Sequence, residues 1–191
     1  VTDEPPDKVA DDGQETFRIT LNLKNKGEFT IPKEKVIATL SGISKDAFSL
    51  SNLDVVSKGS IDGMQKEDSK QIEGAEEEIS FGNAKYKSDL KADFPTTIQA
   101  DVCYYYETDA LASVCLKKDP LKKEKEEQAC DITTVLTIEN SGAPVQVTNV
   151  NQKGMGENEI RVMFDIEKKG SGNIYENDAF STTCSGQDDK K

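Results

Sequence analysis

Four cysteines are the residues of this chain best suited to covalent chemistry: Cys103, Cys115, Cys130 and Cys184. No two of them form a Cys-x-x-Cys pair, and the chain has no histidine to complete a metal site. This pattern favours two disulfides, and therefore an oxidising, extracellular or cell-surface location. Two alternatives stay open, namely four free thiols in a cytosolic protein and one zinc ion held by all four thiolates.

Geometry suggests how two of the cysteines pair. The segments 98–106 and 112–116 both alternate apolar and polar residues, and a turn near Asp109 would join them as a hairpin. In that register Cys103 lies opposite Cys115 on the outer face. Directly opposed residues of antiparallel strands lie about 4.5–5.5 Å apart, a separation that a disulfide can span.

The other two cysteines, Cys130 and Cys184, would then clamp the first and last strands of a second domain. The same hairpin places Tyr104 and Tyr106 on the core face and leaves Tyr105 exposed beside the disulfide. Exposed tyrosines are enriched at contact surfaces, so Tyr105 is a candidate contact residue. The alternative is an ordinary exposed tyrosine without a function.

Catalysis is limited by what the chain lacks. Without histidine there is no His–Ser or His–Cys pair and no histidine-ligated metal. Two carboxylates could hydrolyse a glycoside, but the chain has no tryptophan to stack on a sugar, so we predict no enzyme activity. No cofactor is predicted either. Calcium is the one alternative, because oxygen-rich loops occur at 11–12, 62–63, 173–178 and 188–189, although none matches a known calcium loop.

Charge and hydropathy argue against two classes of partner, nucleic acids and membranes. The chain of 191 residues carries 36 acidic and 24 basic residues, a net charge of -12 that repels nucleic acid. No apolar run approaches the roughly 18 residues that span a membrane, so we expect no membrane insertion by this segment. The chain begins at Val1 without a signal-type segment, which suggests a processed or excised piece of a longer protein.

Short alternating runs separated by glycine turns predict an all-β fold. The run 66–70 is predicted as a polar loop, and the acidic run 76–78 is compatible with one helical turn. The clearest alternations are at 17–23, 36–40, 98–106, 145–150 and 160–166.

Composition divides the chain into two tandem β-sandwich domains. The predicted segments are a flexible or extended acidic arm at 1–14, a first domain at 15–118, a charged linker at 119–127, a second domain at 128–186 and a polar tail at 187–191. The second domain has about five strands, fewer than the seven of a complete immunoglobulin-type sandwich. It is therefore expected to need a strand from another chain or segment to cover its open edge.

Two stretches, Leu21–Gly27 and Ile166–Gly172, share a strand that ends in a short turn with glycine. They resemble the first hairpin of immunoglobulin-like adhesion modules of the CARDB type, although Lys168 stands where asparagine is usual. The segments Val102–Leu116 and Ser141–Val150 resemble uncharacterised archaeal cell-surface and secreted proteins. The resemblance implies tandem immunoglobulin-like β-sandwiches, secreted or tethered to a membrane, and it carries no catalytic motif.

Together these observations predict a non-catalytic structural subunit of an extracellular or cell-surface assembly, such as a filament or surface layer, built by β-strand and edge contacts. Its partners would be further copies of itself or other cell-surface proteins. The alternative is an adhesin or receptor-type binding module of a larger surface protein that recognises a protein or a glycan.

Overall fold

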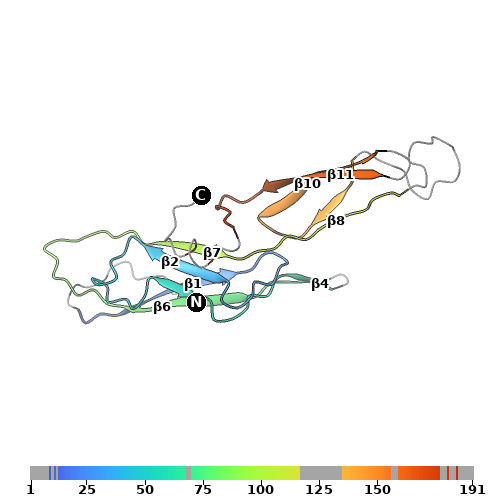
Figure 1. Ribbon diagram of the computed structural model, residues 1–191. Helices are drawn as coiled ribbons and strands as arrows, with labels where there is room; N and C mark the ends of the chain where they lie inside the picture. Colours follow the sequence, from blue (N-terminus) through green and yellow to red (C-terminus); the bar gives the residue numbers. More distant parts are fainter. Residues whose placement is uncertain are drawn as a thin grey trace. The chain divides into compact units, whose positions relative to one another are not determined.

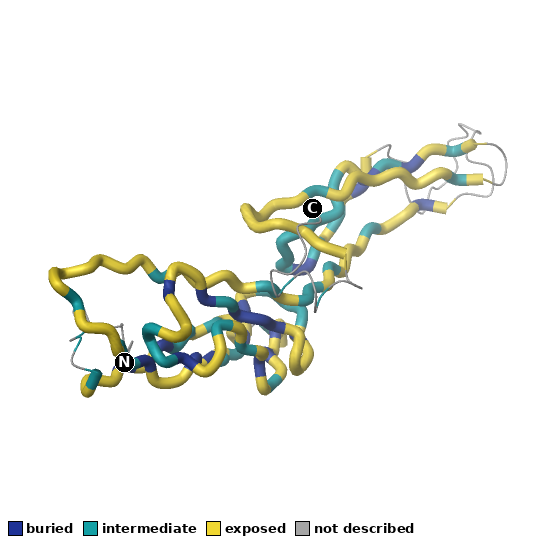
Figure 2. Tube along the Cα trace, turned by 60° about the vertical axis from the view of Figure 1, so that its left-hand side comes forward, coloured by how far each residue is buried: buried dark blue, intermediate teal, exposed yellow. Residues whose placement is uncertain are grey.

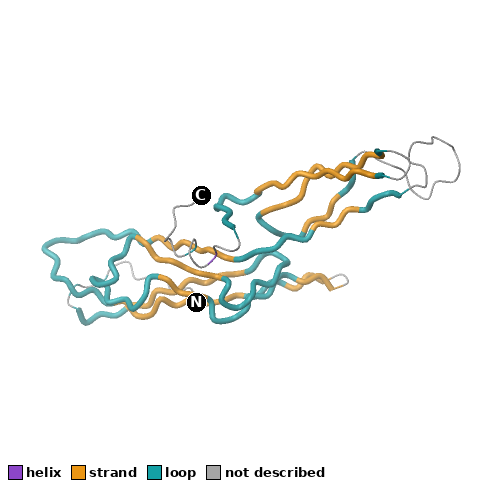
Figure 3. Tube along the Cα trace, in the orientation of Figure 1, coloured by secondary structure: helices purple, strands orange, loops and turns teal. Residues whose placement is uncertain are grey.

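The structure is a computed structural model that describes residues 9, 11, 13–67, 70–116, 135–155, 159–176, 180 and 184. Its regular elements in these ranges are eleven strands, so the predicted all-β class is confirmed (Figures 1 and 3). Within the same ranges, no helix has the length and apolar character needed to cross a membrane. The chain forms two compact units: unit 1 comprises Val1–Tyr106 with Ile174–Lys191, and unit 2 comprises Glu107–Asn173.

Unit 1 contains seven of the described strands in three antiparallel sheets. β1 (Phe17–Lys24) pairs with β6 (Glu76–Ala84). β2 (Val36–Ser41) lies between β3 (Asp54–Val56) and β7 (Gln99–Tyr104). β4 (Gln65–Glu67) pairs with β5 (Lys70–Ile72) in a small hairpin.

The core of unit 1 forms between the β1–β6 sheet and the sheet centred on β2, as in a β-sandwich. Alternation places Phe17 and Ile19 of β1, and Val36, Ala38 and Leu40 of β2, in this one cluster. Ile79 and Phe81 of β6 complete it. The strands predicted from the alternations at 17–23 and 36–40 are therefore confirmed, and both sheets cover each other's apolar face.

A β-bulge adjusts β6 to this core. Between the pairs Ile19–Gly82 and Thr20–Ser80, β6 carries one extra residue, Phe81. Gly82 adopts a φ of 92°, a value that a residue with a Cβ rarely takes, so glycine permits the bulge. Phe81 is only 4% exposed, and the bulge shifts the alternation by one residue so that Ala84, opposite Phe17, is buried as well.

At two places in unit 1 the structure differs from what the local sequence suggested. The acidic run Glu76–Glu78 is the start of strand β6 rather than a helical turn, because its backbone pairs with the end of β1. The segment around 66–70 is the hairpin of β4 and β5, with residues 68 and 69 outside the described ranges. In both cases the hydrogen-bonded partner, rather than the polarity of the run, decides the structure.

The predicted hairpin of 98–106 with 112–116 is also wrong. β7 pairs with β2, and β8 (Ala110–Ala112) pairs with β9 (Ile138–Asn140). Asp109, the expected turn, is held by Ser141 instead: its N–H donates to the Ser141 hydroxyl at 3.0 Å, and its C=O accepts from the Ser141 N–H at 2.8 Å. The chain therefore leaves unit 1 after Tyr106 and does not fold back on β7.

The buried and exposed faces of these strands differ from the prediction as a consequence. Tyr104, predicted for the core, is exposed, whereas Cys115, predicted for the outer face, is buried. Tyr106 is partly buried and packs against the core of unit 1.

Unit 2 contains β8, β9, β10 (Val145–Gly154) and β11 (Ile160–Lys168). β10 and β11 form an antiparallel pair, as do β8 and β9. The bounds of the two units differ from the predicted domains 15–118 and 128–186, because β8 precedes the charged run and its partner β9 follows it. The predicted linker 119–127 and tail 187–191 lie outside the described residues.

Part of the predicted acidic arm at 1–14 is described, and it contacts unit 1. Val9 is partly buried and packs against the core. The side chain of Asp11 accepts a hydrogen bond of 2.8 Å from the N–H of Leu90. These two positions are therefore held by the first unit.

Candidate functional site: the open strand of unit 2

Unit 2 has a small core that covers only part of its main hairpin. Of the sixteen buried apolar residues in the described part of the chain, three lie in this unit: Cys115, Leu136 and Val150. By contrast, strand β11 exposes 43% of Val162, 56% of Phe164 and 68% of Ile166. Figure 2 shows exposed positions along most of this strand. We call these three residues the β11 apolar row.

The register shows that the β11 apolar row belongs to the same face as the buried residues of β10. Val162 lies opposite Gln152, and Ile166 lies opposite Val147. Directly opposed residues point to the same side of a sheet. Gln152 is 2% exposed, and its side-chain oxygen accepts a hydrogen bond of 3.3 Å from the N–H of Cys115. One face of the hairpin is thus covered on β10 and open on β11.

A second β-bulge lies in the middle of this hairpin. Between the pairs Thr148–Asp165 and Asn151–Met163, β10 has two residues and β11 has only Phe164. Asn149, in the bulge, has a φ of 51°, which asparagine tolerates better than most residues. The bulge keeps Gln152 on the same face as Val147 although the two are five residues apart.

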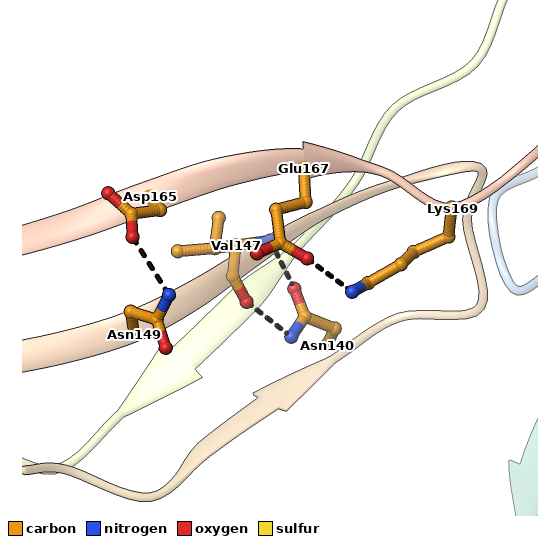
Figure 4. Close-up of polar contacts among 6 residues, drawn as sticks. All are labelled: Asn140, Val147, Asn149, Asp165, Glu167 and Lys169. Atoms are coloured by element: carbon orange, nitrogen blue, oxygen red, sulfur yellow. Dashed lines mark hydrogen bonds and ion pairs between the residues drawn. The ribbon is translucent and has the colours of Figure 1, made fainter.

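The outer edge of β10 is occupied by the segment that contains β9. The side-chain amide of Asn140 imitates a neighbouring strand: its Nδ2 donates to the C=O of Val147, and its Oδ1 accepts from the N–H of Val147, both at 2.9 Å (Figure 4). Farther along, the N–H of Leu136 donates to the C=O of Val150 at 2.8 Å. The backbone of β10 therefore has partners on both sides.

The outer edge of β11 differs. Among the described strands, β11 pairs with β10 alone. Because Val147 directs both its backbone groups to Asn140, it forms a non-hydrogen-bonded pair with Ile166. The N–H and C=O of Ile166 therefore point away from β10. By alternation the backbone groups of Phe164 and Val162 point to the same outer edge, so the apolar row and the available hydrogen-bonding groups coincide.

The opposite face of β11 carries three charged residues and one apolar residue, Met163, which is 47% exposed. Asp165 accepts a hydrogen bond of 2.8 Å from Nδ2 of Asn149, and Glu167 forms an ion pair with Lys169 (Figure 4). The Lys169 ammonium also donates a hydrogen bond to the Glu167 carboxylate, and this bond lowers the pKa of Glu167. Within β11 the charges of Arg161 and Lys168 balance those of Asp165 and Glu167, so the strand is neutral in a chain whose net charge is -12.

The predicted cysteine pairing is wrong. Cys103 is bonded to Cys184, with a Cα–Cα distance of 5.5 Å, so neither the predicted Cys103–Cys115 bond nor the predicted Cys130–Cys184 bond forms. The reason is that β7 has no hairpin partner at 112–116. Cys115 is also disulfide-bonded, and Cys130 lies outside the described residues. None of the described cysteines is free.

The Cys103–Cys184 bond returns the chain to unit 1 after it has passed through unit 2. The two cysteines are 81 residues apart in sequence, and both belong to unit 1. Near the same strands, Nζ of Lys35 lies 5.3 Å from the centre of the Phe180 ring. Both contacts attach positions of the C-terminal segment to the sheet of β2 and β7.

Tyr105, the predicted contact residue, is half-buried rather than exposed. Its ring centre lies 5.7 Å from that of Phe29, and its N–H donates to the C=O of Lys35 at 2.9 Å. Its neighbour Tyr104 is the more exposed of the two, and packs edge-on against Tyr106 at 5.9 Å. A contact role for Tyr105 stays a prediction.

No group of three or more cysteine, aspartate or glutamate side chains that could hold a metal ion occurs among the described residues. Comparisons of the chain with protein-family models, curated proteins and solved structures find no match. The alternation at 160–166 gave the sequence-level signal for β11. What that signal could not reveal is that the strand's apolar face is left open.

Proposed function

We propose that this chain is a non-catalytic structural subunit of an extracellular or cell-surface assembly, and that it associates through the edges of its sheets. The observation that carries this proposal is the β11 apolar row, which lies beside an outer edge with no paired strand in the described part of unit 2. An exposed edge strand with an apolar face is a template for pairing with another chain.

The energetics support association. Fully burying a valine, isoleucine or phenylalanine side chain contributes about 1.5–3 kcal/mol, and about half of each side chain in the row is still exposed. An added strand would also bond the outward N–H and C=O groups of β11. Strand addition is a common mode of protein recognition, in which the backbone supplies affinity and alternate side chains supply specificity.

The disulfide supports the proposed extracellular or cell-surface location. Structural disulfides persist in oxidising surroundings, and the Cys103–Cys184 bond joins residues that only the folded chain brings together. The resemblance of Val102–Leu116 and Ser141–Val150 to archaeal surface proteins points in the same direction.

The experiment is sedimentation velocity on the oxidised chain over a wide range of protein concentrations, with electron microscopy of the same samples. We expect a concentration-dependent rise in mass, and regular oligomers, filaments or sheets in the images. A chain that stays monomeric at every concentration would contradict an assembly function.

The second candidate is the binding module of a larger surface protein. It is favoured by a different observation: Val102 and Tyr104 are exposed on β7, and β7 is the last strand of its three-stranded sheet among those described. A saturable interaction with a surface protein or glycan, abolished by Tyr104→Ala and unaffected by Phe164→Ala, would favour this function over assembly.

A further inference from the structure

We infer that the partner of β11 is a second copy of this chain, whose own β11 pairs antiparallel with it about a two-fold axis at Phe164. This inference rests on the proposed function, association through sheet edges, and names the strand, partner and register. The two hairpins would then form one four-stranded sheet in the order β10, β11, β11 and β10.

The register follows from the length of the strand. β11 runs from Ile160 to Lys168, so Phe164 is its central residue. When two copies pair antiparallel about Phe164, all nine residues of each strand find a partner. Each Phe164 then lies opposite the other Phe164, and each Val162 opposite Ile166 of the second copy. The two apolar rows become one continuous face of six side chains.

The opposite face of β11 is self-complementary in the same register. Arg161 of each copy lies opposite Glu167 of the other, so the symmetric pairing brings two opposite-charge pairs together. The strand itself is neutral, whereas the whole chain carries a net charge of -12. Two copies that repel each other at long range therefore meet at a strand that adds no repulsion of its own.

The backbone also fits. The N–H and C=O of Ile166 point away from β10, and the alternation extends this direction to Phe164 and Val162. In a pairing about Phe164, each of these three residues lies opposite a residue of the second copy whose N–H and C=O also point to the outer edge. The outer edge of β11 can therefore form a regular antiparallel ladder with a copy of itself.

The N-terminal arm of the chain is a poorer occupant. A donated strand must present alternate apolar residues, and residues 1–14 contain only Val1, Val9 and Ala10 as apolar residues other than proline and glycine. Val9 already packs against the core of unit 1.

The first test compares Phe164→Lys with Leu111→Lys by sedimentation velocity on the full, oxidised chain. Both residues are highly exposed in unit 2, so neither substitution disturbs a buried side chain. We expect Phe164→Lys to weaken self-association about tenfold or more, because two lysines would meet on the axis. Leu111→Lys on β8 is the matched control and should associate like the unmodified chain.

A charge exchange tests the register. Arg161→Glu and Glu167→Arg, each alone, should weaken self-association about three- to tenfold, because like charges then oppose each other. The double variant restores opposite charges and should return to within about threefold of the unmodified chain. Failure of the double variant to recover would overturn the register about Phe164.

A cross-link supplies the geometric test. Residues in a hydrogen-bonded antiparallel pair have Cα atoms about 5.5 Å apart, within the range of a disulfide. Phe164→Cys should therefore give a covalent dimer under mild oxidation, whereas Leu111→Cys should not.

The outcomes separate the two proposals. If the unmodified chain associates and Phe164→Lys associates equally well, pairing through β11 is overturned and the assembly function stands on another edge. If the unmodified chain stays monomeric, both proposals are overturned. A chain that stays monomeric but binds a different surface protein would likewise overturn both proposals, and would favour the binding-module function.

Discussion

Unit 1 and unit 2 have the same kind of strands but very different cores. Thirteen of the buried apolar residues in the described ranges lie in unit 1, and three lie in unit 2. In unit 1, the β1–β6 sheet and the sheet centred on β2 cover each other. In unit 2, the short β8–β9 pair leaves the β11 apolar row open. Alternating apolar residues give a strand one apolar face. That face is buried in a core only where a second layer of similar size covers it.

Two phenylalanines make this difference measurable. Phe81 and Phe164 each lie at a β-bulge of a two-stranded ladder. Phe81 is 4% exposed, whereas Phe164 is 56% exposed. Phe81 is the extra residue of its bulge, whereas Phe164 lies on the strand opposite its bulge. Both are phenylalanines on the apolar face of an antiparallel pair, so the contrast reflects mainly the covering layer.

The largest expected effect is that of Phe81→Ala. This substitution should lower the free energy of unfolding of unit 1 by about 3–5 kcal/mol, since it removes a buried ring and leaves a cavity. Phe164→Ala should cost less than about 1 kcal/mol in the monomer. Urea unfolding at low protein concentration, followed by hydrogen exchange resolved along the chain, measures both. Equal losses in the two variants would remove the proposed difference between the units.

The disulfide gives the next effect. Replacing Cys103 and Cys184 together by serine should destabilise unit 1 by about 2–4 kcal/mol, because the bond closes a long loop in the unfolded chain. Hydrogen exchange should quicken in unit 1 and change little in unit 2. Peptide mapping without reduction should recover Cys103 linked to Cys184. A peptide that links Cys103 to Cys115 would contradict this pairing.

The two units also differ in the hydrogen bonds that an asparagine side chain makes in each. In unit 1, Asn25 is buried, and its Nδ2 donates to the C=O of Phe29 at 2.8 Å and of Ile61 at 3.0 Å. In unit 2, half-buried Asn140 bonds the backbone of Val147 alone. Asn25→Ala should cost about 2–3 kcal/mol because it leaves buried carbonyls without this partner, and Asn140→Ala about 1 kcal/mol.

Thermal unfolding of the two variants checks the order of these effects. A larger loss for Asn140→Ala would mean that the link from β9 to β10 stabilises unit 2 more than the contacts of Asn25 stabilise unit 1. Asn52→Ala, at an exposed position of unit 1, is a suitable control for the substitution itself.

The sequence predicted the all-β class and the strands at 17–23 and 36–40, because alternation in each of these runs matches one buried face. It could not predict the partner of β7. The hairpin hypothesis assumed that neighbouring strands pair, whereas β7 pairs with β2, whose residues lie 58 to 68 positions before their partners in β7. The error in the cysteine pairing follows from the same assumption, since Cys184 lies 81 residues from Cys103.

The candidate site was predictable in part. The alternation at 160–166 marks a strand with one apolar face, and the small size of the second domain suggested an open edge. The exposed row itself depends on which distant segments of unit 2 lie over β11, which is a long-range property. Local sequence carries little information about it.

The smallest effect concerns the surface ion pairs of the two units. Hydrogen bonds from Lys24 lower the pKa of Glu73 in unit 1, and those from Lys169 lower the pKa of Glu167 in unit 2. A carboxylate with a lowered pKa in the folded state stabilises the fold above its ordinary pKa, and this contribution disappears as the pH falls through the lowered value. Glu73 is exposed and the side chain of Glu167 is 43% exposed, so the effect on unfolding should be slight.

The pKa values themselves provide the sharper measurement. Carboxyl carbon chemical shifts, titrated by NMR, should show the pKa of Glu73 rising in Lys24→Met and that of Glu167 rising in Lys169→Met. Lys33→Met, which removes a cation paired with Glu34, is the control and should leave both values unchanged. If self-pairing brings Arg161 of a second copy to Glu167, the pKa of Glu167 should fall further as the protein concentration rises, whereas that of Glu73 should not. A concentration-independent value for Glu167 in a chain that does self-associate would indicate that another edge forms the contact.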